Sequence, residues 1–132
     1  MTTKIHLIAP YFTESPDQFI IMTETDRPKL LVVLTSASTL PSNGQKTGWY
    51  LPELVHPYKE LASQVEIVTA SPAGGEAPLD PYSVEASSDD LDCQDFLRNK
   101  QSLYKHTQRL ETFLGHSSEF AGIFFVGGHG RK

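Results

Sequence analysis

Glu53 is the acidic residue of this sequence whose position best suits acid–base chemistry. It follows Pro52 at the start of a segment with helical periodicity, so its carboxylate would lie in a first turn, where partial positive charge favours the ionised form. Two interpretations fit. Glu53 is a solvated acid that complements the helix dipole, or it is a general acid or base that faces a crevice. A helical wheel places it opposite the apolar stripe, near Glu60, which favours the solvated acid.

A second candidate site follows the last apolar run, where Gly127, Gly128 and His129 occur in succession. Two glycines after a strand permit a tight turn whose backbone N–H groups could face an oxyanion. An ordinary strand-ending turn explains the same residues. The turn does not match a phosphate-binding loop, because no Ser or Thr and no helix follow it.

Cys93 is the only thiol in the sequence, and Asp89, Asp90, Asp92 and Asp95 surround it. Neighbouring carboxylates oppose formation of a thiolate, which is the reactive form of cysteine. We therefore expect Cys93 to be a poor nucleophile with a structural or incidental role. A single cysteine also excludes an internal disulfide and is typical of a reducing compartment.

The histidines match no metal-binding motif that can be recognised from spacing. None is spaced from Cys93 like a zinc ligand, and the sequence contains no His-Glu-x-x-His. His56 belongs to a His-Pro-Tyr segment, and we interpret it as a packing or hydrogen-bonding residue rather than a ligand. The sequence thus predicts neither a metal site nor another cofactor. The five histidines are His6, His56, His106, His116 and His129.

Short apolar runs separated by polar segments predict the elements that must position these residues. Each run is continuous and rich in branched side chains, which is typical of strands buried on both faces of a parallel sheet. A helix is expected to begin near Leu51, and Pro57 should kink or split it. A second helix is expected from Phe96 or Leu103 to Leu114, with Gly115 as its C-cap. The three predicted strands are 29–35, 65–69 and 121–126.

This order of elements predicts a doubly wound α/β fold. In such folds ligands bind at the carboxyl ends of the strands. That rule selects the segments 36–53, 71–75 and 127–130, which contain Glu53 and the Gly-Gly turn. The pattern is that of an N-terminal half only, since the sequence ends soon after the third strand.

Composition narrows the class of protein further. The 132 residues carry 11 Lys and Arg against 16 Asp and Glu, a net charge of −5, which argues against nucleic acid as a partner. No apolar run approaches the roughly 20 residues of a membrane helix, and no secretory leader is recognisable. We expect a cytoplasmic protein without a membrane partner. It would consist of a partly irregular extension over residues 1–28 and an incomplete α/β domain over residues 29–132.

Taken together, the motifs resemble the ThiJ/PfpI superfamily, and in particular its glutathione-independent glyoxalase (glyoxalase III) and heat-shock chaperone branch. The resemblance covers roughly residues 29–130. It implies a flavodoxin-like fold. The segments that carry it are Leu31–Thr35, Gly44–Tyr58 (GxxTGWYLPELxHPY), Val65–Ser71, Pro78–Ser83 and Ile123–Gly130.

The resemblance implies specific roles for the candidate residues. Glu53 matches the family's helix acid, which would shuttle a proton during enediol formation from a small dicarbonyl substrate. Gly127 and Gly128 match the turn that helps to build the oxyanion site, with His129 beside it. The implied reaction converts methylglyoxal to D-lactate without glutathione or metal, a lyase activity of the D-lactate dehydratase type. Deglycase and holdase activities are also known in the family.

The family's nucleophilic cysteine lies on a strand-to-helix elbow downstream of the Gly-Gly-His-Gly turn. The present sequence stops before that elbow, and Cys93 does not occupy it. Without a thiolate no hemithioacetal forms, so we expect this chain alone to be catalytically inactive. Two alternatives come from other classes: a non-catalytic, stress-related chaperone or interaction module, and a flavodoxin-like nucleotide binder. The segment 36–47 lacks a phosphate cradle, which argues against the nucleotide binder.

The third predicted strand implies an association surface. In a complete sheet the run 121–126 would be internal, whereas here its far edge would expose unpaired backbone groups beside apolar side chains. We therefore expect self-association of the isolated chain through this strand.

Overall fold

The structure of the protein is a computed structural model that describes residues 27–128. The extension predicted for residues 1–28 lies almost entirely outside the described residues, and so does His129.

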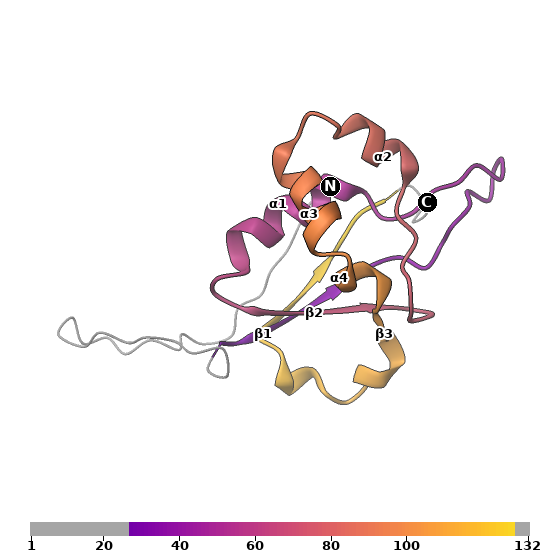
Figure 1. Cartoon of the computed structure of the whole chain (residues 1–132). Coiled ribbons are helices and arrows are strands. Elements are labelled where there is room, and N and C mark those ends of the chain that lie inside the picture. The colour runs from indigo at the N-terminus through magenta and orange to yellow at the C-terminus, as the bar shows by residue number, and fades with distance from the viewer. Residues whose placement is uncertain (1–26, 129–132) are drawn as a thin grey trace.

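The described residues form a four-stranded parallel sheet in the order β3-β2-β1-β4. Helices pack on one face, and two 3₁₀ helices lie on the other (Figure 1). This arrangement confirms the predicted flavodoxin-like α/β fold. The elements are β1 (Lys29–Val33), α1 (Leu51–Leu61), β2 (Glu66–Ser71), α2 (Pro81–Ala86), α3 (Leu91–Asn99), α4 (Ser102–Lys105), β3 (Gln108–Arg109), η2 (Leu110–Phe113), η3 (Ser117–Glu119) and β4 (Gly122–Phe125).

Strand β1 is apolar along its length because both of its faces are covered. Leu30 and Val32 belong to the larger core, which they share with α1 and α3. Leu31 and Val33 face the opposite way and join a smaller cluster with residues of the η2–η3 segment. Side chains alternate between the two faces of a strand, so a run without polar interruptions predicts the two-sided burial that is observed.

Helix α1 begins at Leu51 as predicted, but Pro57 does not split it. The helix continues to Leu61, with Leu54 and Val55 buried against the sheet. Proline removes a single N–H donor, the one that would otherwise bond to the carbonyl four residues earlier. Burial of the apolar stripe on both sides of Pro57 maintains the helix despite that loss.

The prediction of a second long helix that ends at Leu114 is wrong. Three shorter helices lie between residues 81 and 105 instead, and residues 110–113 form a 3₁₀ helix. Asp80 and Asp90 begin two of them, because their carboxylates accept hydrogen bonds from backbone N–H groups of the first turn. Residues 80–90 thus contain two N-caps of the usual Asp type.

Thr107 is the reason why the helix cannot continue. Its backbone N–H donates to the carbonyl of Gly75 at 3.0 Å, and its carbonyl accepts from the Gly75 N–H at 2.9 Å. Backbone groups paired in a bridge cannot also form the bonds of an α-helix. Gly115 has a φ of +81°, but it follows the 3₁₀ helix η2 and caps no helix that ends at Leu114.

Strand β4 is the edge of the described sheet, because β1 is its only partner there. Phe124 is buried, whereas Ile123 and Phe125 are 38% and 58% exposed. A groove of about 620 Å³ lies on the face of the sheet to which Ile123 and Phe125 point. Among the groove's lining residues are Leu31, Leu110, Phe113, Phe120, Ile123 and Phe125.

Within residues 27–128, no helix has both the length and the apolar character needed to cross a bilayer.

Candidate functional site

The segment between β1 and α1 brings three strand ends together at one edge of the sheet. Trp49 donates its backbone N–H to the carbonyl of Pro78 at 2.9 Å, and Tyr50 donates to the carbonyl of Gly127 at 2.9 Å. The turn after β4 and the segment after β2 are therefore both held against the residues that lead into α1. This is the edge at which ligands bind in open α/β sheets.

Two glycines are required at this crossing because backbones pass very close to one another. A Cβ atom at Gly48 would lie 2.1 Å from the carbonyl oxygen of Pro78, and one at Gly128 would lie 2.3 Å from the carbonyl oxygen of Gly48. Both distances are far below van der Waals contact. Gly128 thus has a packing role that accounts for its residue type, whatever its N–H group does.

Glu53 lies in the first turn of α1, next to this crossing. Its backbone N–H donates to the carbonyl of Tyr50 at 3.1 Å. The residue is half-buried, and its Oε1 atom is fully buried without a hydrogen-bond partner among the described residues. The helical wheel, which favoured a solvated acid, treats the helix as isolated and does not include the segments packed around its first turn.

The buried oxygen of Glu53 leads to a stability prediction. An unsatisfied buried polar group costs about 1–3 kcal/mol, whereas a carboxylate in a first turn gains about 0.3–1 kcal/mol from the helix dipole. We expect Glu53→Met to raise the free energy of unfolding by about 1 kcal/mol, which corresponds to about 4–8 °C in the thermal midpoint. Thermal unfolding followed by circular dichroism measures this.

Glu60→Met is the matched control, because Glu60 is an exposed acid on the same helix. The free energy of unfolding of Glu60→Met should differ from that of the unmodified chain by about 0.5 kcal/mol or less. A lower midpoint for Glu53→Met than for the unmodified chain would show that the carboxylate is satisfied in solution.

Cys93 does not lie at this edge of the sheet. It is fully buried in the first turn of α3, within the larger core. Burial, followed by the negative charge of Asp90, raises the pKa of the Cys93 thiol to about 11. The expectation of a poor nucleophile is confirmed, although burial rather than the acidic neighbours is the largest cause.

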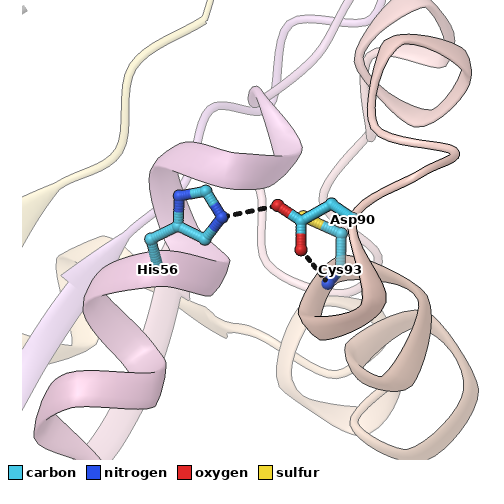
Figure 2. Close-up of side chains that lie close together, drawn as sticks. All are labelled: His56, Asp90 and Cys93. Atoms are coloured by element: carbon cyan, nitrogen blue, oxygen red, sulfur yellow. Dashed lines mark hydrogen bonds and ion pairs between the residues drawn. The ribbon is translucent and has the colours of Figure 1, made fainter.

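A second group of side chains lies between α1 and the start of α3. His56 and Asp90 interact through Nε2 and Oδ2 at 2.7 Å, and the other oxygen of Asp90 accepts the backbone N–H of Cys93 at 3.1 Å (Figure 2). The interpretation of His56 as a hydrogen-bonding residue is confirmed. The sequence did not show this group, because its members come from separate elements and match no fixed spacing.

The known proteins that resemble this chain are found among solved structures. No family model and no curated protein matches the chain. The rapid encystment protein of 24 kDa from Francisella tularensis is 33% identical, with a TM-score of 0.63 over 78% of this chain and 45% of its own. A second solved structure is 33% identical, with a TM-score of 0.62 over 79% of this chain and 43% of its own.

The sequence and the fold of the chain are similar to those of the ThiJ/PfpI superfamily. Glyoxalase III from Candida albicans shares the fold as well, with 24% identity and a TM-score of 0.60 over 78% of this chain and 44% of its own. The chain spans less than half of the length of each of these proteins.

The His56–Asp90 pair should make the stability of the chain depend on pH. The hydrogen bond from His56, followed by that from the Cys93 N–H, lowers the pKa of Asp90 below its ordinary value of 3.8. A lowered pKa in the folded state means that the ionised carboxylate stabilises the fold above pH 3.8, and that this contribution is lost as the pH falls through the folded-state value.

Asp90→Asn isolates the charge, because asparagine is also a good N-cap. We expect the variant to be less stable than the unmodified chain near neutral pH, and the two stabilities to converge in acid. Urea unfolding over a range of pH measures this. A difference that stays constant down to the lowest pH would show that the charge of Asp90 contributes nothing.

Proposed function

We propose that this chain provides the proton-transfer part of a glyoxalase III-type site that acts on small dicarbonyls such as methylglyoxal. Glu53 would be the proton shuttle, and the Gly127–Gly128 turn would help to form the oxyanion site. The observation that carries the proposal is the buried Oε1 of Glu53, which has no hydrogen-bond partner in the described part of the chain. Such a group destabilises a fold, and it is typical of sites that are organised for a ligand.

The positions of the candidate residues support the same proposal. Backbone hydrogen bonds of Tyr50 link the first turn of α1, which carries Glu53, to the carbonyl of Gly127 after β4. An acid and a glycine turn at the carboxyl edge of a parallel sheet fit a site for a small polar substrate. Glyoxalase III from Candida albicans, which shares this fold, is named for the activity proposed here.

We further propose that this chain alone does not convert methylglyoxal. The reaction inferred from the family begins when a thiolate adds to the aldehyde carbon. Cys93 is the only thiol in the sequence, it is fully buried, and its pKa is raised to about 11. At neutral pH it is therefore almost entirely protonated, and it is not accessible to the substrate.

A thiol supplied in solution tests the role of Glu53 separately from the missing nucleophile. A small thiol adds to the aldehyde of methylglyoxal to give a hemithioacetal. Removal of the C1 proton gives an enediol, and protonation at C2 then gives a lactoyl thioester. No oxidant or reductant is needed, because the proton that leaves C1 is balanced by the one that arrives at C2.

We expect the purified chain to accelerate thioester formation only when the thiol is present. Glu53→Gln should abolish the acceleration, whereas Glu60→Gln should retain it. The absorbance of the thioester measures its formation, and an assay of released lactate measures lactate formation. Failure of the chain to accelerate the reaction would overturn the role of Glu53. Lactate formation without added thiol that is lost in Cys93→Ala would overturn the claim of inactivity.

A second candidate function, a non-catalytic interaction module, is favoured by the edge strand β4. We propose that two copies of the chain associate through this strand, because Phe125 is 58% exposed beside a largely apolar groove. Unpaired backbone groups at a sheet edge can pair with those of another copy.

Phe125→Lys should shift the chain toward monomer, since a charge at the edge opposes strand pairing. Tyr82→Lys is the control, because Tyr82 is an aromatic residue of α2 that is 64% exposed. Light scattering at tens of micromolar protein measures the mass. A monodisperse monomer for the unmodified chain would contradict this proposal.

A further inference from the structure

Three side chains with different metal-binding atoms converge between α1 and the first turn of α3. The Nε2 or Nδ1 of His56, a carboxylate oxygen of Asp90 and the Sγ of Cys93 all lie within 4.8 Å of one another. In Figure 2 the imidazole points from α1 toward the carboxylate, and the sulfur lies behind that carboxylate. Imidazole, carboxylate and thiolate are the three kinds of protein ligand that zinc accepts.

We propose that His56, Asp90 and Cys93 form a Zn²⁺ site, with water as the fourth ligand. The bound ion would replace the proton of the Cys93 thiol, which passes to solvent, and the lone pairs of a neutral imidazole and an ionised carboxylate would complete the protein ligands. Nothing in this proposal depends on the activity proposed for Glu53, because Glu53 is not one of the ligands.

The two carboxylate oxygens of Asp90 have separate roles, which makes the site compatible with the fold. Oδ1 accepts the backbone N–H groups of Asp92 and Cys93 and so caps α3. Oδ2 faces the imidazole of His56, whose Nε2 lies 2.7 Å away. A metal ion bound at Oδ2 would therefore replace the contact with His56 and leave the helix cap intact.

The arrangement needs little movement to bind an ion. Zinc lies about 2.0–2.3 Å from its nitrogen, oxygen and sulfur ligands at tetrahedral angles, so two ligand atoms of one ion lie roughly 3.3–3.8 Å apart. The His56 Nε2 and the Asp90 Oδ2, now 2.7 Å apart, must therefore separate by about 0.6 Å to admit the ion, and the Sγ of Cys93 already lies within 4.8 Å of both. The His56 side chain is 56% exposed, so its ring can rotate without disturbing the core. Cys93 and Asp90 are already fixed by the first turn of α3.

Co²⁺ is the probe for this site, because thiolate coordination to cobalt gives a charge-transfer band in the near ultraviolet. Cys93 is the only thiol of the chain, so the band reports on this residue alone. We expect the metal-free, untagged chain to develop the band up to one equivalent of Co²⁺, and Zn²⁺ to abolish it by displacement. Zn²⁺ should also raise the thermal midpoint of the chain.

Matched variants distinguish this site from adventitious binding. Cys93→Ala should eliminate the band, and His56→Ala should weaken Co²⁺ binding at least tenfold, while circular dichroism confirms that both variants are folded. His116→Ala is the control, because His116 also pairs with a carboxylate, that of Glu119, but has no thiol beside it. The affinity of His116→Ala for Co²⁺ should equal that of the unmodified chain.

Two results would overturn the proposal. The first is the absence of the sulfur band when Co²⁺ is in excess over the folded chain. The second is a band that persists at unchanged affinity in folded His56→Ala. Neither result would affect the thiol-dependent assay of Glu53.

Discussion

Replacing Trp49 with alanine should remove a large part of the stability of this domain. Trp49 is fully buried, and its ring packs against Tyr104 and Phe96 at centroid distances of 5.4 and 6.4 Å. Its indole N–H donates to the carbonyl of Ala77 at 3.2 Å. Truncating a buried tryptophan costs about 3–5 kcal/mol, against a total stability of about 5–15 kcal/mol for a typical domain.

The expected loss is large because Trp49 connects separate parts of the fold. It contacts α3 and α4 through aromatic rings, and its backbone bonds to the segment after β2. Urea unfolding followed by circular dichroism measures the loss, since Trp49 is the only tryptophan and its fluorescence disappears in the variant.

Tyr82→Ala is the control for removal of an aromatic ring. Tyr82 is 64% exposed, and surface changes of this kind alter stability by about 0.5 kcal/mol or less. A loss below about 1 kcal/mol for Trp49→Ala would contradict the buried position of this residue.

Cys93 should react with an aromatic disulfide reagent at least about 100-fold more slowly than an exposed cysteine at pH 8. With a pKa of about 11, about 0.1% of the thiol is ionised at that pH, compared with about a quarter of an unperturbed cysteine. Burial of the sulfur slows the reaction further. The absorbance of the released thiol, measured with a chelator present, gives the rate.

The control separates burial from the effect of acidic neighbours. Ser88→Cys in a Cys93→Ala background places a thiol at an exposed position of the same acidic segment. It should react at a rate close to that of a free cysteine. Equal rates at the two positions would show that Cys93 is accessible, and would remove the physical reason for expecting an inactive chain.

Raising the pH above about 8.5 should lower the free energy of unfolding, because the buried thiol of Cys93 keeps its proton in the folded state. The folded chain keeps the Cys93 proton up to a pKa of about 11, whereas the unfolded chain releases it nearer to pH 8.5. The neutral thiol therefore stabilises the folded state below about pH 8.5, and this contribution is lost as the pH rises toward the folded-state value.

The sequence predicted the elements whose patterns are local. The apolar run of β1 indicated a strand covered on both faces, and Pro52 indicated the start of α1. Both predictions are confirmed, because strand alternation and helix entry depend on neighbouring residues alone. The same local rules failed from residue 106 to residue 114, where a long-range backbone bridge between Thr107 and Gly75 prevents a helix.

The motifs of the sequence also indicated a resemblance to the ThiJ/PfpI superfamily, and the structural comparisons confirm this resemblance. They indicated Glu53 as a candidate acid, but they could not decide whether its carboxylate is solvated. A helical wheel gives directions around one helix axis, whereas burial depends on every segment that packs against that axis. The structure shows that the Oε1 atom of Glu53 is buried, and that the turn after β4 is bonded to the residues that lead into α1.

Tertiary structure alone decided the convergence of His56, Asp90 and Cys93. The sequence shows each of these residues, but it shows neither the N-cap role of Asp90 nor the proximity of the three side chains. Packing of α1 against α3 brings together side chains that are 34 residues apart in the chain. Such a contact is fixed by burial of apolar stripes on both helices, which no spacing of histidine and cysteine records.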